Sequence, residues 1–140
     1  CPCGNHGCLE QYISEPAVLS RYQELSGRTT VSIDDLVWSY NQKEADALAV
    51  VDEFTTYLAC GINNLWNLFS PECIILNNQL TAYLPQLLPE ILQKLSARFR
   101  ATCQLKLSTL QDTGVLLGAA RVCISKYLGI EKLYFSGFQP

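Results

Sequence analysis

The sequence lacks the features that would place it in a membrane or on DNA. It contains no apolar run of the roughly 18 residues needed to cross a bilayer, and its first residues do not follow the pattern of a secretory signal peptide. We therefore expect neither secretion nor membrane spanning. Charged residues make up only 16% of the chain, and the formal net charge is −3. Because affinity for a phosphate backbone comes from clustered lysine and arginine, this chain is not expected to bind DNA by itself.

Histidine is nearly absent, since His6 is the only one, whereas cysteine occurs seven times. Four cysteines stand singly among apolar neighbours and are predicted to be buried as small hydrophobic side chains; they are Cys60, Cys73, Cys103 and Cys123. The odd cysteine count fits a reducing compartment best, and we expect a cytoplasmic protein.

The composition is apolar for a soluble domain. The 140 residues suffice for one ordinary domain with a real hydrophobic core, and 49% of them are hydrophobic. We expect part of this apolar surface to pack against a partner molecule or against another lobe of a longer protein.

The other three cysteines fall in the stretch Cys1-Pro2-Cys3-Gly4-Asn5-His6-Gly7-Cys8. Thiolates at this density in a cytoplasmic chain are typical zinc ligands, and the two glycines allow the turns that bring the sulfurs together. The alternative is a reduced, cysteine-rich turn without metal. Zinc takes four ligands, so His6 is either an ordinary loop residue or a substitute fourth ligand.

Periodicity predicts a helix-rich α/β domain. Apolar residues recur at helical spacing over residues 8–25, 33–40, 43–69, 80–99 and 113–129. An apolar run at 73–76 and an alternating run at 103–109 predict strands. The resulting order of helix, strand, helix, strand, helix over residues 43–129 is typical of an α/β domain with parallel or mixed strands.

Single residues predict where the helices begin and end. Ser14 is expected to cap the first long helix, Gly27 to end it, and Ser32 to start the next one. Pro85 and Pro89 would break a helix interior, so the regular helix within 80–99 is expected to begin near Pro89.

Two further patterns predict packing. Gly61 stands in the middle of a long helix, where glycine costs about 1 kcal/mol relative to alanine, so another element is expected to pack closely there. The run Cys73-Ile74-Ile75-Leu76 is wholly apolar, which predicts a strand covered on both faces.

Residues 1–10 resemble the signature Cys-x-Cys-Gly-x-x-Gly-Cys-Leu-Glu of the ROK family at every fixed position. This family contains sugar-responsive transcriptional repressors and sugar kinases. The resemblance implies that Cys1, Cys3 and Cys8 bind a structural zinc ion and that Glu10 contacts hydroxyls of a bound sugar. The family's fourth zinc ligand is a histidine upstream of this motif, so the chain is expected to be the C-terminal part of a longer protein.

The resemblance also implies a fold for nearly the whole chain. It is the C-terminal lobe of an actin-like, ribonuclease-H-like ATPase fold, helix-rich with short strands. Residues 69–76 are similar to the family's helix-to-strand junction, and residues 118–120 to a Gly-Ala pair near its C-terminus. The expected organisation is a lobe at 1–130, containing a zinc loop at 1–10, a helical excursion at 26–41 and the alternating segment at 43–129, followed by a tail at 131–140.

Asn77 and Asn78 depart from the pattern of the family's kinases, which carry two glycines at this point so that the backbone can approach nucleotide phosphates. Asparagine side chains would project into that space. The residues are therefore a degenerate nucleotide loop or merely a polar strand end. Because the kinase's catalytic aspartate would also lie upstream, no catalytic residue is expected in this chain.

Three functions remain open from the sequence. The favoured one is the effector domain of a ROK-type repressor, which binds a sugar, a sugar phosphate or an N-acetylated sugar and contacts DNA only through an upstream winged helix. The second is the C-terminal lobe of a sugar kinase of the glucokinase or N-acetylmannosamine kinase type. The third is a structural or dimerisation fragment. The resemblance further implies a homo-oligomer.

Overall fold

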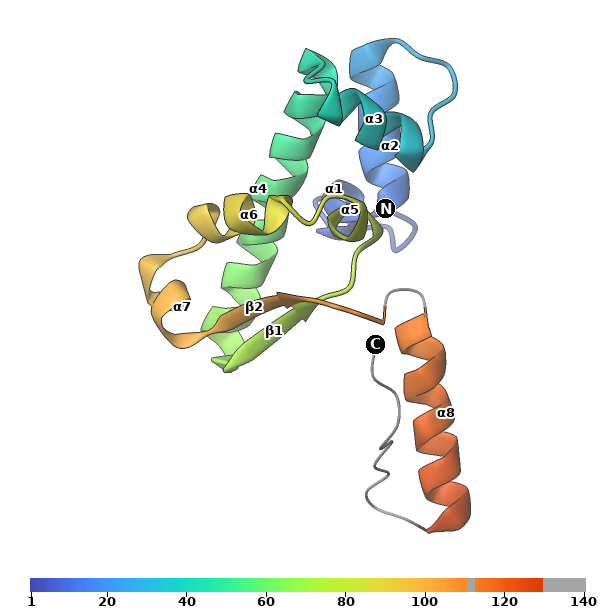
Figure 1. The fold of residues 1–140 in the computed structure, drawn as a ribbon, viewed down its shortest axis with the longest axis vertical. Coiled ribbons are helices and arrows are strands. Elements are labelled where there is room, and N and C mark those ends of the chain that lie inside the picture. Colours follow the sequence, from blue (N-terminus) through green and yellow to red (C-terminus); the bar gives the residue numbers. More distant parts are fainter. Residues whose placement is uncertain (111–112, 130–140) are drawn as a thin grey trace. The chain divides into compact units, whose positions relative to one another are not determined.

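The computed structural model describes residues 1–110 and 113–129, and the chain divides into two compact units, residues 1–107 and 108–140. The first unit contains seven helices and a small sheet, and the second contains one long helix (Figure 1). The predicted tail at 131–140 lies outside the described residues.

Three helices follow the cysteine loop, and side-chain caps mark the starts of the second and third. They are α1 (Glu10–Ile13), α2 (Glu15–Ser26) and α3 (Ile33–Asn41). The Ser14 hydroxyl accepts a hydrogen bond from the Ala17 amide at 3.4 Å, and Gly27 ends α2 at φ 67°. Ser32 forms a reciprocal capping box with Asp35 at the start of α3. The predicted roles of Ser14, Gly27 and Ser32 are thus confirmed.

Helix α4 (Ala45–Phe69) is the centre of the first unit and packs against α1, α2, α3 and α6. Its buried face contains Ala47, Val51, Phe54, Leu58 and Ile62, as the periodicity predicts. Toward the C-terminal end of α4 the same apolar stripe is no longer buried, since Leu65 is 50% exposed and Phe69 is 69% exposed. Lys94 of α6 joins this helix to α4 by donating hydrogen bonds to the hydroxyls of Thr55 and Thr56, each at 2.8 Å.

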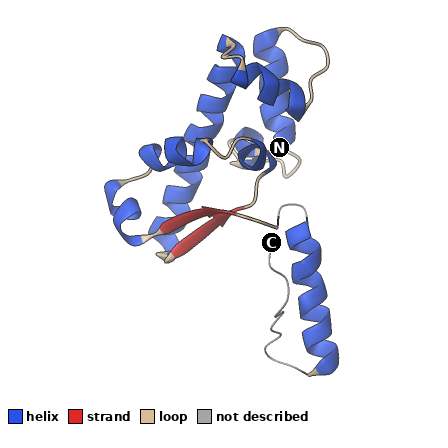
Figure 2. Ribbon diagram, viewed as in Figure 1, coloured by secondary structure: helices blue, strands red, loops and turns tan. Residues whose placement is uncertain are grey.

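Strands β1 (Cys73–Leu76) and β2 (Gln104–Leu107) pair in parallel, with Ile74 opposite Leu105 (Figure 2). Within the described residues the sheet has only these two strands. Leu76 is buried, but Ile75 on the other face of β1 is 65% exposed. The prediction that this strand is covered on both faces is therefore wrong for the described part of the chain.

Three short helices connect the strands, namely α5 (Gln79–Tyr83), α6 (Leu87–Lys94) and α7 (Ala97–Thr102). Pro85 separates α5 from α6, whereas Pro89 lies in the first turn of α6, where its missing N–H costs little. Ser96 interrupts the helical pattern by capping α7, since its hydroxyl accepts a hydrogen bond from the Phe99 amide at 3.1 Å. The expectation of one regular helix from Pro89 to Phe99 is wrong because of this cap.

The second unit contains α8 (Thr113–Leu128), and Gly129 follows it with φ 64°. Both limits agree with the sequence pattern. Among the described residues, no helix is both long enough and apolar enough to cross a membrane.

The isolated cysteines differ from expectation. Cys103 is buried next to β2, and burial is the main cause that raises the pKa of its thiol. Cys60, Cys73 and Cys123 are exposed, so the prediction of four buried cysteines holds for one of them only. Apolar sequence neighbours do not bury a side chain that points away from the core.

Candidate metal and sugar-ligand loop

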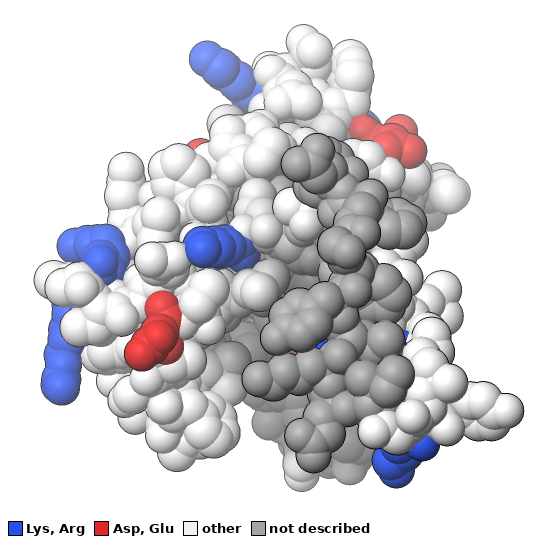
Figure 3. Space-filling view, turned by 60° about the horizontal axis from the view of Figure 1, so that its bottom comes forward, with Lys and Arg blue, Asp and Glu red and all other residues white. Residues whose placement is uncertain are grey.

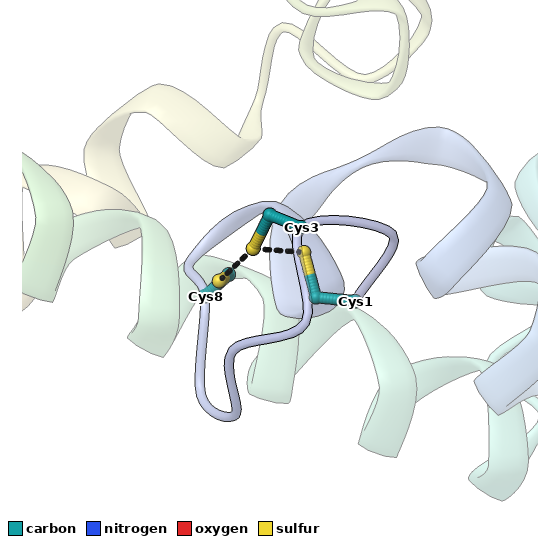
Figure 4. A group of neighbouring side chains, drawn as sticks. All are labelled: Cys1, Cys3 and Cys8. Atoms are coloured by element: carbon teal, nitrogen blue, oxygen red, sulfur yellow. Dashed lines mark hydrogen bonds between the residues drawn. The ribbon is translucent and has the colours of Figure 1, made fainter.

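The cysteine loop brings three sulfur atoms together in front of α1 (Figure 4). The Cys3 Sγ lies 3.1 Å from the Cys1 Sγ and 3.5 Å from the Cys8 Sγ, and all three atoms lie within 4.8 Å of one another. Gly4 and Gly7 adopt φ values of 82° and 77°, which side chains with a Cβ rarely adopt. The backbone of this loop therefore depends on glycine at both positions.

The geometry of the three thiols fits a zinc ion. Tetrahedral coordination with Zn–S bonds of about 2.3 Å separates neighbouring sulfurs by about 3.8 Å, so the Cys3 sulfur would move outward by less than 1 Å from each neighbour to reach this spacing. The Asn5 backbone amide and the Cys8 thiol lower the pKa of Cys3, which favours the thiolate that binds metal. The three cysteines can supply three of four ligands. His6 does not join their cluster of candidate ligand atoms.

Glu10 is the first residue of α1, two positions after Cys8, and it is exposed. Within the described residues its side chain forms no hydrogen bond or ion pair. The following helix is capped by Ser14, not by Glu10. The carboxylate is therefore available to an external ligand, and it also lies in the first turn of α1, where a negative charge is favourable.

Leu9 links the cysteine loop to the central helix. It lies between Cys8 and Glu10, and its side chain packs on Gly61 of α4. A Cβ at position 61 would lie only 2.5 Å from the Leu9 Cδ2 atom. The close packing predicted from a glycine in mid-helix is thus confirmed, and the element that packs there is the candidate site itself.

We expect Gly61→Ala in the full-length protein to change the cysteine loop while leaving the thermal stability of the fold nearly the same. The new methyl group displaces Leu9, while alanine gains about 1 kcal/mol of helix propensity that offsets a similar overpacking cost. The melting temperature should stay nearly constant, whereas zinc release to a chelator should become about threefold faster or more. Cys60→Ala, on the exposed side of the same helix, is the control. An unchanged release rate in Gly61→Ala would contradict the proposed link through Leu9.

Asn77 and Asn78 follow β1 directly. Asn78 has an extended backbone, with φ −136° and ψ 138°, and its side-chain oxygen accepts a hydrogen bond from the Thr81 amide at 3.3 Å. It is the N-cap of α5. The segment therefore ends β1 and caps α5, and both sequence-based alternatives are compatible with these contacts.

The sequence does not reveal one group of side chains that α1, α2 and α4 bring together. Arg21 of α2 and Glu53 of α4 form an ion pair although they are 32 positions apart, and Tyr12 stacks on Tyr57. No motif joins these positions, so only the fold brings them together.

Charged side chains are sparse on the face of the molecule drawn in Figure 3. On its described part, lysine and arginine side chains are scattered, with acidic residues among them. The described part of this face therefore carries no cluster of lysine and arginine of the kind that contacts a phosphate backbone.

Comparison with known proteins gives one consistent family. A family model described as "ROK family" matches residues 1–126. The chain is 31% identical over 137 residues to a xylose repressor of Bacillus spizizenii, covering 95% of this chain and 35% of the repressor. It is 29% identical over 128 residues to an N-acetyl-D-glucosamine kinase of Histophilus somni, covering 90% of this chain and 42% of the kinase. The chain thus spans less than half of these relatives.

The fold is similar to that of a solved structure. A ROK family glucokinase from Streptomyces griseus, in complex with glucose and AMPPNP, superposes with a TM-score of 0.75 at 20% identity. The likeness covers 87% of this chain and 46% of that structure. The predicted fold class, a helix-rich C-terminal lobe with short strands of the actin-like ATPase type, is confirmed.

Proposed function

The chain belongs to the ROK family, and from this premise we propose that it is part of the sugar-binding effector domain of a transcriptional regulator. Its relatives include both xylose repressors and N-acetyl-D-glucosamine kinases, so membership alone supports a relation to sugars without separating the two functions. We base the choice between these two functions on the residues that follow β1.

The observation that carries the proposal is the Asn77-Asn78 segment. ROK kinases place two glycines at this position, where the backbone approaches phosphate groups closely. Here Asn78 is extended and its side chain is engaged in capping α5. Replacing this arrangement by a phosphate loop would remove the cap, which stabilises a helix start by about 1 kcal/mol. The segment is therefore suited to holding α5 and poorly suited to a nucleotide.

In this proposal Cys1, Cys3 and Cys8 hold zinc together with a fourth ligand from outside the chain. Zinc supplies folding energy to a loop that has few apolar residues of its own. The role of the cysteines is structural, because Cys8 lies two residues before Glu10 and a metal-bound loop would fix the direction of that side chain. Leu9 adds a second constraint through its contact with Gly61.

Glu10 is proposed to recognise the sugar. A carboxylate can accept hydrogen bonds from two neighbouring hydroxyls, and such charge-assisted bonds contribute about 1.5–3 kcal/mol each when water is excluded. The side chain is exposed and has no partner within the described residues, so no existing interaction must be broken on binding.

The proposal also covers DNA binding, oligomeric state and location of the full-length protein. DNA binding would come from a winged helix in a separate part of the full-length protein, and the protein would act as a homo-oligomer in the cytoplasm. The exposed apolar side chains at the end of α4, Leu68 and Phe69, are compatible with burial against another lobe or subunit.

We expect the full-length protein not to phosphorylate sugars, because Asn77 and Asn78 occupy the place where a nucleotide phosphate would bind. A coupled ATP-consumption assay across common hexoses and N-acetylhexosamines is the measurement. Sugar-dependent turnover near the ~10 s⁻¹ of an ordinary enzyme would contradict the regulator and establish the kinase. The likeness to a glucokinase structure keeps the kinase as the second candidate.

A further inference from the structure

A cleft of about 580 Å³ opens between α1, α2 and α4, which pack against one another (Figure 1). Its walls include Tyr12 from α1, Arg21 and Glu24 from α2, and Glu53 and Tyr57 from α4. We call it the tyrosine cleft. Its volume falls in the range of small-molecule sites, about 300–1,000 Å³. Neither the three cysteines nor Glu10 lines it.

The charged side chains of the tyrosine cleft carry one negative charge in excess. The Arg21 Nε and Nη2 atoms donate to the two carboxylate oxygens of Glu53 at 2.9 and 3.0 Å, and Nη1 donates to Glu24 at 3.1 Å. The hydrogen bonds between Arg21 and Glu53 lower the pKa of Glu53 and raise the pKa of Arg21. One guanidinium set against two carboxylates leaves the lining with a formal net charge of −1.

Glu24 carries the accessible part of this excess charge. Glu53 receives two parallel hydrogen bonds from Arg21, whereas Glu24 receives one, and the second Glu24 oxygen accepts no hydrogen bond within the described part of the chain. The Glu24 side chain is 62% exposed. A positively charged ligand therefore finds an acceptor at Glu24 without breaking an existing ion pair.

Another part of the lining is aromatic. The rings of Tyr12 and Tyr57 stack with centroids 4.3 Å apart and an interplanar angle of 31°. Each tyrosine keeps 39% of its surface exposed. The electron-rich face of a tyrosine ring attracts a cation, and stacking orders the two side chains before any ligand arrives, which reduces the entropy lost on binding. Apolar residues, among them Ala17 and Phe54, complete the lining and suit a hydrocarbon skeleton.

We propose that the tyrosine cleft binds a small organic ammonium ion. Its cationic nitrogen lies against the exposed tyrosine rings and the free oxygen of Glu24, and its hydrocarbon skeleton packs on the apolar lining. Coulomb attraction to the excess negative charge and the attraction of a cation to an aromatic face then act on the same atom.

Other ligand classes fit the tyrosine cleft less well. An anion would be repelled by the excess negative charge. A hard metal ion takes about six oxygen ligands, whereas both Glu53 oxygens already accept hydrogen bonds from Arg21. The proposal goes beyond the function proposed above and does not depend on it, since neither a sugar nor Glu10 takes part.

The test compares two ammonium ions with neutral molecules of nearly the same shape on the full-length protein. Choline is paired with dimethylbutanol, in which carbon replaces the quaternary nitrogen, and pentylamine is paired with pentanol. Saturation-transfer NMR titrations give the dissociation constants. We expect at least one cation to bind about tenfold more tightly than its neutral counterpart. Preference for choline would assign the larger share to the tyrosine rings, and preference for pentylamine to the hydrogen bond with Glu24.

Variants locate the binding. Tyr57→Leu and Glu24→Gln should each raise the dissociation constant of the preferred cation about threefold or more. Tyr83→Leu, an exposed tyrosine on α5, and Glu15→Gln, an exposed glutamate on α2, are the matched controls and should leave it unchanged, because neither residue lines the cleft. Glu10→Gln should also leave it unchanged, whatever its effect on sugar binding.

Several results would overturn the proposal. These are two cations that bind no more tightly than their neutral counterparts, an unchanged dissociation constant in Tyr57→Leu or in Glu24→Gln, or loss of cation binding in Glu10→Gln. If Tyr57→Leu does not fold, Glu24→Gln decides alone, because the Glu24 side chain is largely exposed and the substitution spares the core.

Discussion

Replacing Glu10 with glutamine in the full-length protein is expected to weaken sugar binding tenfold or more while the melting temperature hardly changes. Glutamine keeps the size of the side chain but removes the charge, and a lost charge-assisted hydrogen bond costs about 1.5–3 kcal/mol, where 1.4 kcal/mol is tenfold in affinity. Stability should be preserved because Glu10 is exposed and forms no hydrogen bond or ion pair within the described residues. Isothermal titration with the best-binding sugar of a screen measures the effect.

Glu15→Gln is the matched control for this experiment. Glu15 is also exposed and also lies in the first turn of a helix, but it belongs to α2 and is not proposed to contact sugar. It should leave the affinity unchanged. If Glu10→Gln instead lowers stability slightly and keeps the affinity, then Glu10 is only a favourable charge at a helix start, an effect of about 0.3–1 kcal/mol.

The second large effect is expected from Cys8→Ser. The three sulfurs lie within 4.8 Å of one another, and removing one leaves two of the proposed thiolate ligands. Zinc content should fall from about one ion per chain to a small fraction of that value. The unfolding temperature should fall by about 5 °C or more, which corresponds to roughly 1–2 kcal/mol in a protein of this class. Metal analysis and thermal unfolding under reducing conditions are the measurements.

Cys60→Ser serves as the control, because Cys60 is exposed on α4 and far in sequence from the loop. Its zinc content should equal that of the unmodified protein. A full-length protein that contains no zinc before any substitution would show that the loop is the metal-free turn considered from the sequence. The two site variants should also differ from each other: Cys8→Ser should weaken sugar binding, whereas Glu10→Gln should leave zinc in place.

Local features of the fold could be predicted from the sequence because local interactions determine them. The capping box of Ser32 and Asp35 and the left-handed Gly27 depend on residues only a few positions apart. The break at Ser96 was missed, although serine is a good N-cap, because the apolar spacing continues across it. Spacing records which residues are apolar, and it does not record whether the helix between them is continuous.

Burial was harder to predict than secondary structure. Ile75, Leu65 and Phe69 are as apolar as their buried neighbours, yet they are largely exposed in the described unit. Whether an apolar side chain is covered depends on which element lies opposite, and this is a property of the tertiary structure. The same reason explains why Cys103 is buried and Cys73 is not.

The candidate site likewise has one part that the sequence predicts and another that depends on the tertiary structure. The cysteines and Glu10 lie within ten consecutive residues, so a motif predicts them and the loop brings the sulfurs together. The contact of Leu9 with Gly61 and the ion pair of Arg21 with Glu53 join segments distant in sequence, and only the folded chain reveals them. For the contact on Gly61, a glycine in mid-helix was the one available signal.

We propose that this chain senses a sugar for a DNA-binding protein. The most direct measurement is fluorescence anisotropy of the full-length protein on a labelled DNA fragment taken from the region upstream of its own gene, titrated with the best-binding sugar of the screen. We predict that the sugar changes the affinity for DNA by tenfold or more, and that Glu10→Gln binds the DNA equally well but needs a correspondingly higher sugar concentration. An affinity for DNA that no sugar alters, or the same sugar response in Glu10→Gln, would contradict the account.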